Sequence, residues 1–151
     1  LYSRDIQNMN SADASLVDRQ TAAVAVIEPD KITRDSLQFL FESINLKVVT
    51  FTDAEHFLSA LPGQTLTCLI SEISLPGIDG LALIEQLKQM NKLLPTIILT
   101  RQNDVSIAVQ AIHAGAADFI EKPFVEPVLL NRVLQIVSKF SYSENTSGEK
   151  P

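Results

Sequence analysis

The sequence predicts an α/β fold in which a doubly wound, five-stranded parallel sheet carries helices on both of its faces. Short apolar runs, each too short for a helix, alternate with longer segments whose apolar residues recur at helical spacing. This alternation continues from residue 21 to residue 140. Because each helix returns the chain to the same end of the sheet, successive strands run parallel, and right-handed connections place helices on both faces.

The expected strands are apolar almost throughout, as burial on both faces of a sheet demands. The first is closed by Glu28-Pro29-Asp30, and Pro95 comes directly before the fourth. In chain order, the five expected strands are Ala22–Ile27, Val48–Phe51, Thr67–Glu72, Thr96–Thr100 and Asp118–Glu121.

Five helices are expected between and after these strands, several with recognisable ends. Thr52 and Glu55 have the spacing of a capping box that opens the second helix. Asp104 is placed to cap the fourth helix, and Gly115 is placed to end it. The expected helices are Lys31–Ile44, Thr52 to about Leu61, a helix after Gly80, a helix after Asp104, and a last helix that begins at Pro127.

The regular part of the chain forms one domain with polar segments on either side. Its expected bounds within the 151 residues are 21–140. Residues 1–20 are polar and lack sustained periodicity, which predicts an N-terminal extension. Residues 141–151 are rich in Ser, Asn, Gly and Glu, which predicts a C-terminal linker or tail.

Composition excludes several classes of function. With 12 basic and 18 acidic residues the net charge is −6, so the surface repels phosphate backbones and this segment is not expected to bind nucleic acid. No apolar run approaches the roughly 18 residues that cross a bilayer, so no membrane association is expected. Cys68 is the single cysteine, which excludes a disulfide framework and favours a buried, reduced thiol in a cytoplasmic protein.

Polar side chains with chemical potential follow four of the expected strands. In an open parallel sheet, ligands bind beyond the carboxyl ends of the strands. Acids, a hydroxyl and a lysine are therefore expected to meet at this edge. They are Glu28 and Asp30 after the first strand, Glu72 at the end of the third, Thr100 and Arg101 at the fourth, and Lys122 with Pro123 after the fifth.

Four segments resemble the receiver domain of two-component response regulators, in particular the type found in FixJ-like and NtrC-like transcriptional regulators. They are Ile27–Asp30, Leu69–Gly80, Ile98–Thr100 and Ala114–Phe124, and the resemblance extends over roughly residues 22 to 138. It implies a flavodoxin/CheY-like sheet with the strand order 2-1-3-4-5 and five helices.

The resemblance also implies roles for the residues at the sheet edge. In this family an aspartate at the end of the third strand accepts a phosphoryl group from a sensor histidine kinase, and acids after the first strand hold Mg²⁺. By position, Glu72 stands where the phosphoacceptor would be. Thr100 and Lys122 take the places that contact phosphoryl oxygens, Phe119 takes the aromatic switch position, and the bond before Pro123 is expected to be cis.

Two departures from the family pattern change the expected chemistry. The carboxylate of Glu72 reaches roughly 1.3 Å further than that of an aspartate, which displaces the nucleophile and predicts an ion pair with Lys122. Pro29 replaces the second metal-holding acid, so Mg²⁺ is expected to bind weakly or not at all, with Glu28 and Glu72 as weak candidate ligands. Asp30 is either a partial substitute or only a helix cap. No other cofactor is expected.

Arg101 follows Thr100 at a position where most relatives carry a small residue. Two placements are open. In one, its side chain covers the acidic edge and pairs with Glu72 or Glu28, closing the entrance for a phosphodonor. In the other, it points into solvent from a mobile loop.

These features favour a pseudo-receiver, a non-enzymatic receiver-like domain that does not accept phosphate and acts as a protein–protein interaction module. Its expected partners are a second copy, a sensor histidine kinase or other signalling protein, and an output domain after the tail that is expected to bind DNA. The expected dimer surface consists of the fourth helix, the fifth strand and the fifth helix, and includes Ser106, Val109, Gln110, His113 and Asp118.

Three questions stay open at this point. The domain is alternatively a conventional phosphorelay receiver, or more remotely a flavodoxin-like cofactor binder. The Glu-Pro-Asp-Lys loop after the first strand contains no glycine to cradle a phosphate, which disfavours the cofactor binder. Glu72 either mimics the phosphorylated state or locks another state, and these differ in the rotamer of Phe119.

Overall fold

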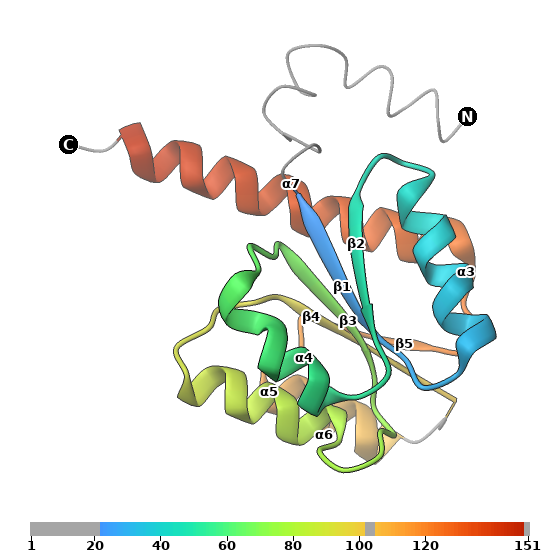
Figure 1. Cartoon of the computed structure of the whole chain (residues 1–151). Helices are drawn as coiled ribbons and strands as arrows, with labels where there is room; N and C mark the ends of the chain where they lie inside the picture. Colours follow the sequence, from blue (N-terminus) through green and yellow to red (C-terminus); the bar gives the residue numbers. More distant parts are fainter. Residues whose placement is uncertain (1–21, 102–104, 150–151) are drawn as a thin grey trace.

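Five parallel strands form one sheet with the order β2-β1-β3-β4-β5, as the sequence and the family resemblance predict (Figure 1). The computed structural model describes residues 22–101 and 105–149. The strands are β1 (Ala23–Ile27), β2 (Lys47–Phe51), β3 (Cys68–Glu72), β4 (Thr96–Thr100) and β5 (Asp118–Glu121).

Helices cover both faces of this sheet in a doubly wound arrangement. Helices α3 and α7 pack on one face, and α4, α5 and α6 pack on the other (Figure 1). With the labels of Figure 1, the helices are α3 (Lys31–Glu42), α4 (Ala54–Ala60), α5 (Gly80–Gln89), α6 (Val105–Ala114) and α7 (Glu126–Glu149), and a short 3₁₀ helix, η1 (Leu61–Gly63), follows α4.

The central strands are buried on both faces because successive side chains point in opposite directions. In β1, Val24 and Val26 pack toward α3 and α7, while Ala25 and Ile27 pack toward α4 and α5. Cys68 on β3 belongs to the first of these cores, and burial raises the pKa of its thiol to about 12. Two-sided burial therefore explains the uninterrupted apolar runs.

The register of β1 against β3 determines which residues meet at the carboxyl edge. Ile27 pairs with Ser71, so the next residues, Glu28 and Glu72, emerge side by side from neighbouring strands. Neighbouring strands lie about 4.8 Å apart, so the two carboxylates lie close together whatever conformation the following loops adopt. The sheet itself thus creates a local excess of negative charge at this edge.

The predicted start of α4 is wrong. The N-cap is Asp53 rather than Thr52, because the Asp53 carboxylate accepts a hydrogen bond from the backbone N–H of His56. Glu55 does not complete a capping box; its carboxylate instead accepts from the backbone N–H of Ile78 in the β3–α5 loop. A carboxylate offers two acceptor oxygens to the first turn, whereas the Thr52 hydroxyl here bonds to Asp53.

The ends of the other helices follow the expectations in part. Gly115 follows α6 with φ +111°, as a C-terminal stop requires. The predicted cap Asp104 and the expected extension 1–20 lie outside the described residues. Helix α7 begins at Glu126, one residue before Pro127, and continues to Glu149 through most of the expected tail. No helix within residues 22–101 and 105–149 is long and apolar enough to span a bilayer.

The loop between β3 and α5 is held from outside by α4. Gly77 adopts φ +76°, a conformation that other residues enter only at a cost. The Glu55 carboxylate that accepts from Ile78 lies where a side chain at position 77 would begin, so its Oε2 would overlap an added Cβ. The close approach of Glu55 and the left-handed backbone together require glycine at this position.

Gly77→Ala should lower the free energy of unfolding by about 1–2 kcal/mol, because the left-handed conformation becomes strained and the Glu55 contact is displaced. Gly63→Ala is the matched control: nothing lies within 4 Å of its added Cβ, so stability should change little. Urea unfolding of both variants measures the difference. Equal stabilities for the two variants would contradict this account of the loop.

Candidate functional site

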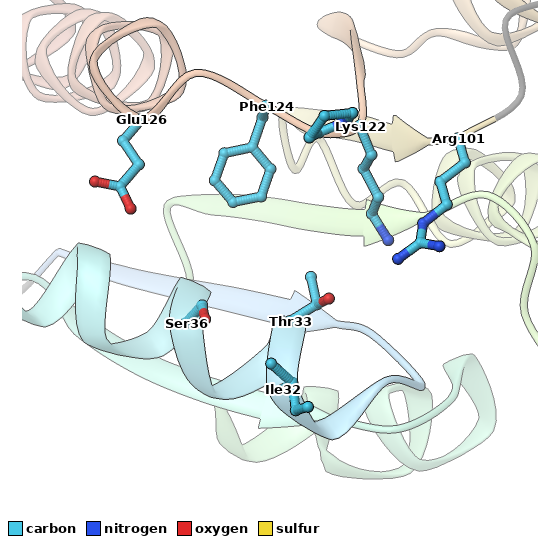
Figure 2. A pocket seen from close by; sticks show the side chains of 8 residues that line it. Ile32, Thr33, Ser36, Arg101, Lys122, Phe124 and Glu126 are labelled. Atoms are coloured by element: carbon cyan, nitrogen blue, oxygen red, sulfur yellow. The ribbon is translucent and has the colours of Figure 1, made fainter.

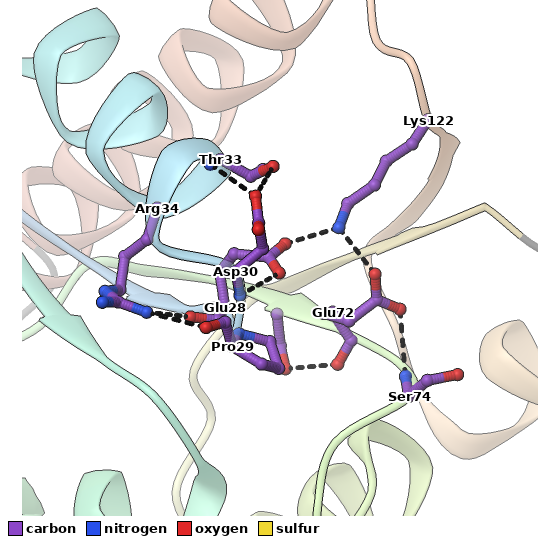
Figure 3. A network of polar contacts seen from close by, with 9 residues as sticks. Glu28, Pro29, Asp30, Thr33, Arg34, Glu72, Ser74 and Lys122 are labelled. Carbon is purple, nitrogen blue, oxygen red and sulfur yellow. Dashed lines mark hydrogen bonds and ion pairs between the residues drawn. The ribbon is translucent and has the colours of Figure 1, made fainter.

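The Lys122 ammonium joins the two acids that the sheet brings together. Its Nζ donates to Oε1 of Glu28 at 2.5 Å and to Oε1 of Glu72 at 2.6 Å (Figure 3). The predicted Glu72–Lys122 ion pair is therefore present, and Glu28 shares the same ammonium. The three side chains come from the ends of β1, β3 and β5, so the site forms only when the sheet is complete.

The second oxygen of each glutamate is bound by the backbone two residues further along. Oε2 of Glu28 accepts from the N–H of Asp30 at 3.1 Å, and Oε2 of Glu72 accepts from the N–H of Ser74 at 2.9 Å. Each carboxylate thus divides its oxygens in the same way, one to the main chain and one to Lys122. All four carboxylate oxygens are engaged.

Burial makes this ion triad sensitive to any unbalanced charge. The side chains of Lys122, Glu28 and Glu72 are 7%, 4% and 10% exposed. Burial opposes the charged ammonium, but hydrogen bonds and charges from both glutamates outweigh it and raise the pKa of Lys122. Two carboxylates facing one ammonium leave a formal charge of −1.

Asp30 is a helix cap and not part of the triad. Its carboxylate accepts from both the hydroxyl and the backbone N–H of Thr33, which fixes the start of α3. These two hydrogen bonds lower the pKa of Asp30. Of the two readings that the sequence allowed, partial metal ligand or cap, the geometry matches the cap.

Arg34 holds the β1–α3 loop and was not found by sequence reasoning. Its guanidinium donates to the carbonyl oxygens of Glu28 at 2.8 Å and Pro29 at 3.1 Å (Figure 3). These bonds fix the backbone from which the Glu28 side chain projects. An arginine one turn into an amphipathic helix carries no sequence signal for this contact.

The other predicted site residues differ in their burial and in what they contact. Thr100 is buried at the end of β4, and its carbonyl accepts from the N–H of Lys122 at 2.8 Å. Phe119 is half-buried on β5 and packs against a core that includes Ile98 and Ala111. The Lys122–Pro123 peptide bond is cis, as predicted.

Arg101 does not form the ion pair that one of its two expected placements required. Among the described residues no salt bridge joins it to Glu72 or Glu28, because Lys122 already serves both carboxylates. Arg101 is exposed and lines a pocket of about 540 Å³, with Thr33, Lys122 and Phe124 among its walls (Figure 2). Lys122 is the member of the triad that lines this pocket, and Arg101 lines it as well.

The residues at this edge do not match what Mg²⁺ requires. The ion needs hard oxygen ligands in near-octahedral geometry, usually from carboxylates with free lone pairs. Here Glu28 and Glu72 are committed to Lys122, Pro29 has no side-chain oxygen, and Asp30 faces Thr33. Within the described ranges, no group of three or more His, Cys, Asp or Glu side chains is placed to hold a metal ion.

The family model for the response regulator receiver domain matches residues 24–134. This chain belongs to that family. The receiver domain is 44% identical over 101 residues to the transcriptional regulatory protein FixJ of Bradyrhizobium diazoefficiens, covering 67% of this chain and 49% of that protein. It is 39% identical over 105 residues to the DNA-binding transcriptional regulator NtrC of Salmonella typhimurium, covering 70% of this chain and 22% of that protein.

Solved structures agree with the fold of this receiver domain. The crystal structure of FixJ-N superposes with a TM-score of 0.72 at 31% identity, covering 80% of this chain and 95% of that one. Full-length FixJ from B. japonicum also gives a TM-score of 0.72, at 39% identity, with 76% of this chain and 57% of that chain covered. The chain spans about half the length of the FixJ proteins that it matches.

Lys122→Met should lower the free energy of unfolding at neutral pH by about 3–5 kcal/mol, because it leaves two buried carboxylates without a counter-charge. The raised pKa means that the folded protein holds this proton more tightly than the unfolded chain does. The stabilisation is therefore complete below the ordinary lysine value of 10.5 and is lost as pH rises above it.

Denaturant unfolding of both proteins between pH 7 and pH 11.5 measures this difference. The stability gap between wild type and Lys122→Met should narrow only in the alkaline range. Lys88→Met serves as the control, because Lys88 pairs with Glu85 at the surface and should contribute less than about 1 kcal/mol. A Lys122→Met protein as stable as Lys88→Met would contradict the importance of the triad.

Proposed function

We propose that this receiver domain does not accept a phosphoryl group and acts as a pseudo-receiver, a protein–protein interaction module that regulates an attached output domain. The observation that supports this most directly is the ion triad. Glu72 occupies the phosphoacceptor position, and both of its carboxylate oxygens are engaged, by Lys122 and by the N–H of Ser74.

The geometry of the triad opposes phosphoryl transfer in two ways. A nucleophilic carboxylate must present a free oxygen within about an ångström of the right position. Glu72 is one methylene longer than aspartate, and both of its carboxylate oxygens already accept hydrogen bonds. The transferring phosphoryl also needs positive charge from a metal ion and a lysine. Lys122 is neutralised by two carboxylates, and the donor set does not suit Mg²⁺.

A conventional phosphorelay receiver is the second candidate. Buried Thr100, and Lys122 followed by a cis peptide bond, stand at the positions that the family uses, and the identity to FixJ is substantial. The family match leaves the flavodoxin-like cofactor binder without support. In the conventional alternative, the sensor histidine kinase is the phosphodonor; in the pseudo-receiver it is at most a binding partner.

The surface that fits a second copy of the chain is formed by α6, β5 and α7. Val105, Val109 and Ile112 are 78%, 49% and 52% exposed and recur at helical spacing along α6, so they form one apolar stripe. Beside it, Arg132 of α7 pairs with Asp118 of β5 at 3.1 Å. An apolar stripe with charges alongside is typical of a surface that associates with a partner.

The proposed output is transcriptional. FixJ and NtrC are transcriptional regulators by name, and this chain covers 49% and 22% of them, which leaves room for a DNA-binding domain of the kind that those names imply. Helix α7 runs on to Glu149 and leads away from the sheet, in position to connect such a domain (Figure 1). With a role in transcription we propose a cytoplasmic location, which the sequence also predicts.

Incubation with acetyl phosphate and Mg²⁺ should leave the mass of the intact protein unchanged. Beryllofluoride with Mg²⁺ should likewise produce no saturable spectral change. The double variant Glu72→Asp, Pro29→Asp is the positive control, because it restores the shorter nucleophile and a second metal-holding acid. A stable phosphoryl adduct on the wild-type protein would overturn the pseudo-receiver and favour the conventional alternative.

Sedimentation equilibrium should show self-association of the wild-type domain that Val109→Glu weakens by at least tenfold, because the substitution places a charge in the apolar stripe. Leu93→Glu is the control: Leu93 is 91% exposed and lies in the turn between α5 and β4, outside the proposed surface. If the Val109→Glu protein still forms dimers and the Leu93→Glu protein does not, the interface includes Leu93 and is not the proposed surface. A monomer at all concentrations would exclude the proposed dimer and favour a locked, inactive state of Glu72.

A further inference from the structure

Lys122 places a positive charge at the point where the two buried carboxylates converge. The contacts of 2.5 and 2.6 Å put Oε1 of Glu28 and Oε1 of Glu72 within about 5 Å of each other, with the ammonium nitrogen between them (Figure 3). Oxygens bound to a divalent ion such as Mg²⁺ at 2.0–2.1 Å lie about 3–4 Å apart across the ion. A small rotation of the Glu28 or Glu72 side chain would convert the spacing around the ammonium into the spacing around a divalent ion.

We propose that the Lys122 ammonium is the resident cation of this site, holding Glu28 and Glu72 together in place of a divalent ion and excluding such ions. This inference rests on the proposed function, because it concerns the same ion triad and explains what the triad does there. It explains why two acids can remain buried side by side at the end of neighbouring strands although a metal-holding residue is missing at Pro29.

Two physical differences favour the ammonium over a free divalent ion. The ammonium is covalently attached to β5, so its effective concentration at the two carboxylates exceeds that of a dilute ion in solution. Mg²⁺ must also give up hydration water, which it does reluctantly, and here it would gain only two carboxylates instead of a full shell of protein oxygens. The backbone N–H groups of Asp30 and Ser74 occupy the remaining carboxylate oxygens.

Removal of the ammonium should expose the cation preference of the two acids. Without Lys122, two buried carboxylates on adjacent strands repel each other, and a divalent ion between them relieves that repulsion. The wild-type protein should therefore ignore divalent ions, whereas a variant without the ammonium should bind them. Methionine keeps most of the volume of the lysine stem and removes only its charge and donors.

The experiment compares the wild-type chain, Lys122→Met, and the triple variant Lys122→Met, Glu28→Gln, Glu72→Gln. Binding of Mn²⁺ is measured by electron paramagnetic resonance and by calorimetry, and thermal unfolding is followed with added Mn²⁺ or Mg²⁺. Lys122→Met should bind Mn²⁺ at least tenfold more tightly than the wild type, and its Tm should rise with Mn²⁺. The triple variant should show neither effect, because neutral amides replace both carboxylates.

If the repulsion between Glu28 and Glu72 unfolds the Lys122→Met protein, a second measurement keeps the proposal testable. Circular dichroism should then show that saturating Mn²⁺ restores the folded state, while the triple variant is folded without any ion. A Lys122→Met chain that stays unfolded in saturating Mn²⁺ and Mg²⁺ overturns the proposal. Equal Mn²⁺ affinity in wild type and Lys122→Met overturns it, and so does Mn²⁺ binding that persists in the triple variant.

These outcomes are separable from the test of the proposed function. A phosphoryl adduct on the wild-type protein removes the pseudo-receiver, and the Mn²⁺ comparison still reports whether the ammonium excludes divalent ions. Conversely, a wild-type protein that takes up no phosphoryl group but binds Mn²⁺ as tightly as Lys122→Met keeps the pseudo-receiver and removes the resident cation.

Discussion

The ion triad of Glu28, Glu72 and Lys122 is the interaction on which the carboxyl edge depends. Strand register brings the two acids together, because they directly follow a paired position of β1 and β3. Two buried carboxylates so close repel strongly unless a counter-charge lies between them. Lys122 supplies it from β5, two strands away from β3, so a long and flexible side chain is needed there. Strands β1 and β3 thus bring two negative charges together, and the end of β5 supplies the positive charge that balances one of them.

Acids at this edge divide into caps and site residues, and the division follows from position in the loop. Asp30, Asp53 and Asp79 each accept from a backbone N–H three residues later and so fix the starts of α3, α4 and α5. Glu28 and Glu72 come directly at the strand ends, before any helix begins, and their longer side chains reach across to Lys122. An aspartate one or two residues further along has a helix to cap and cannot also join the triad.

Much of the fold was predictable because two-sided burial leaves an unmistakable apolar pattern, and the Glu72–Lys122 pair was predictable from the length of a glutamate. The ion pair between Glu28 and Lys122 was not predictable, since it depends on the register of β1 against β3. The Thr52 cap failed because Asp53 next to it is the stronger acceptor, and Arg34 lacked any signal because its acceptors are carbonyl groups. Helix α7 continues through a stretch whose polar composition predicted a tail, which shows how weakly composition alone limits a helix already nucleated by packing.

Strand β5 connects the triad to the surface proposed for self-association. At its carboxyl end, the backbone of Lys122 bonds to Thr100 while its side chain holds the two acids; at its amino end, Asp118 pairs with Arg132 of α7. Phe119 packs between them against the core beneath α6. A ligand shifts a conformational equilibrium only by its differential affinity for the two states. In the proposed pseudo-receiver, the ammonium at this edge leaves phosphate and metal ions no such difference in affinity, and we propose that a partner that binds the α6–β5–α7 surface is the input of this domain.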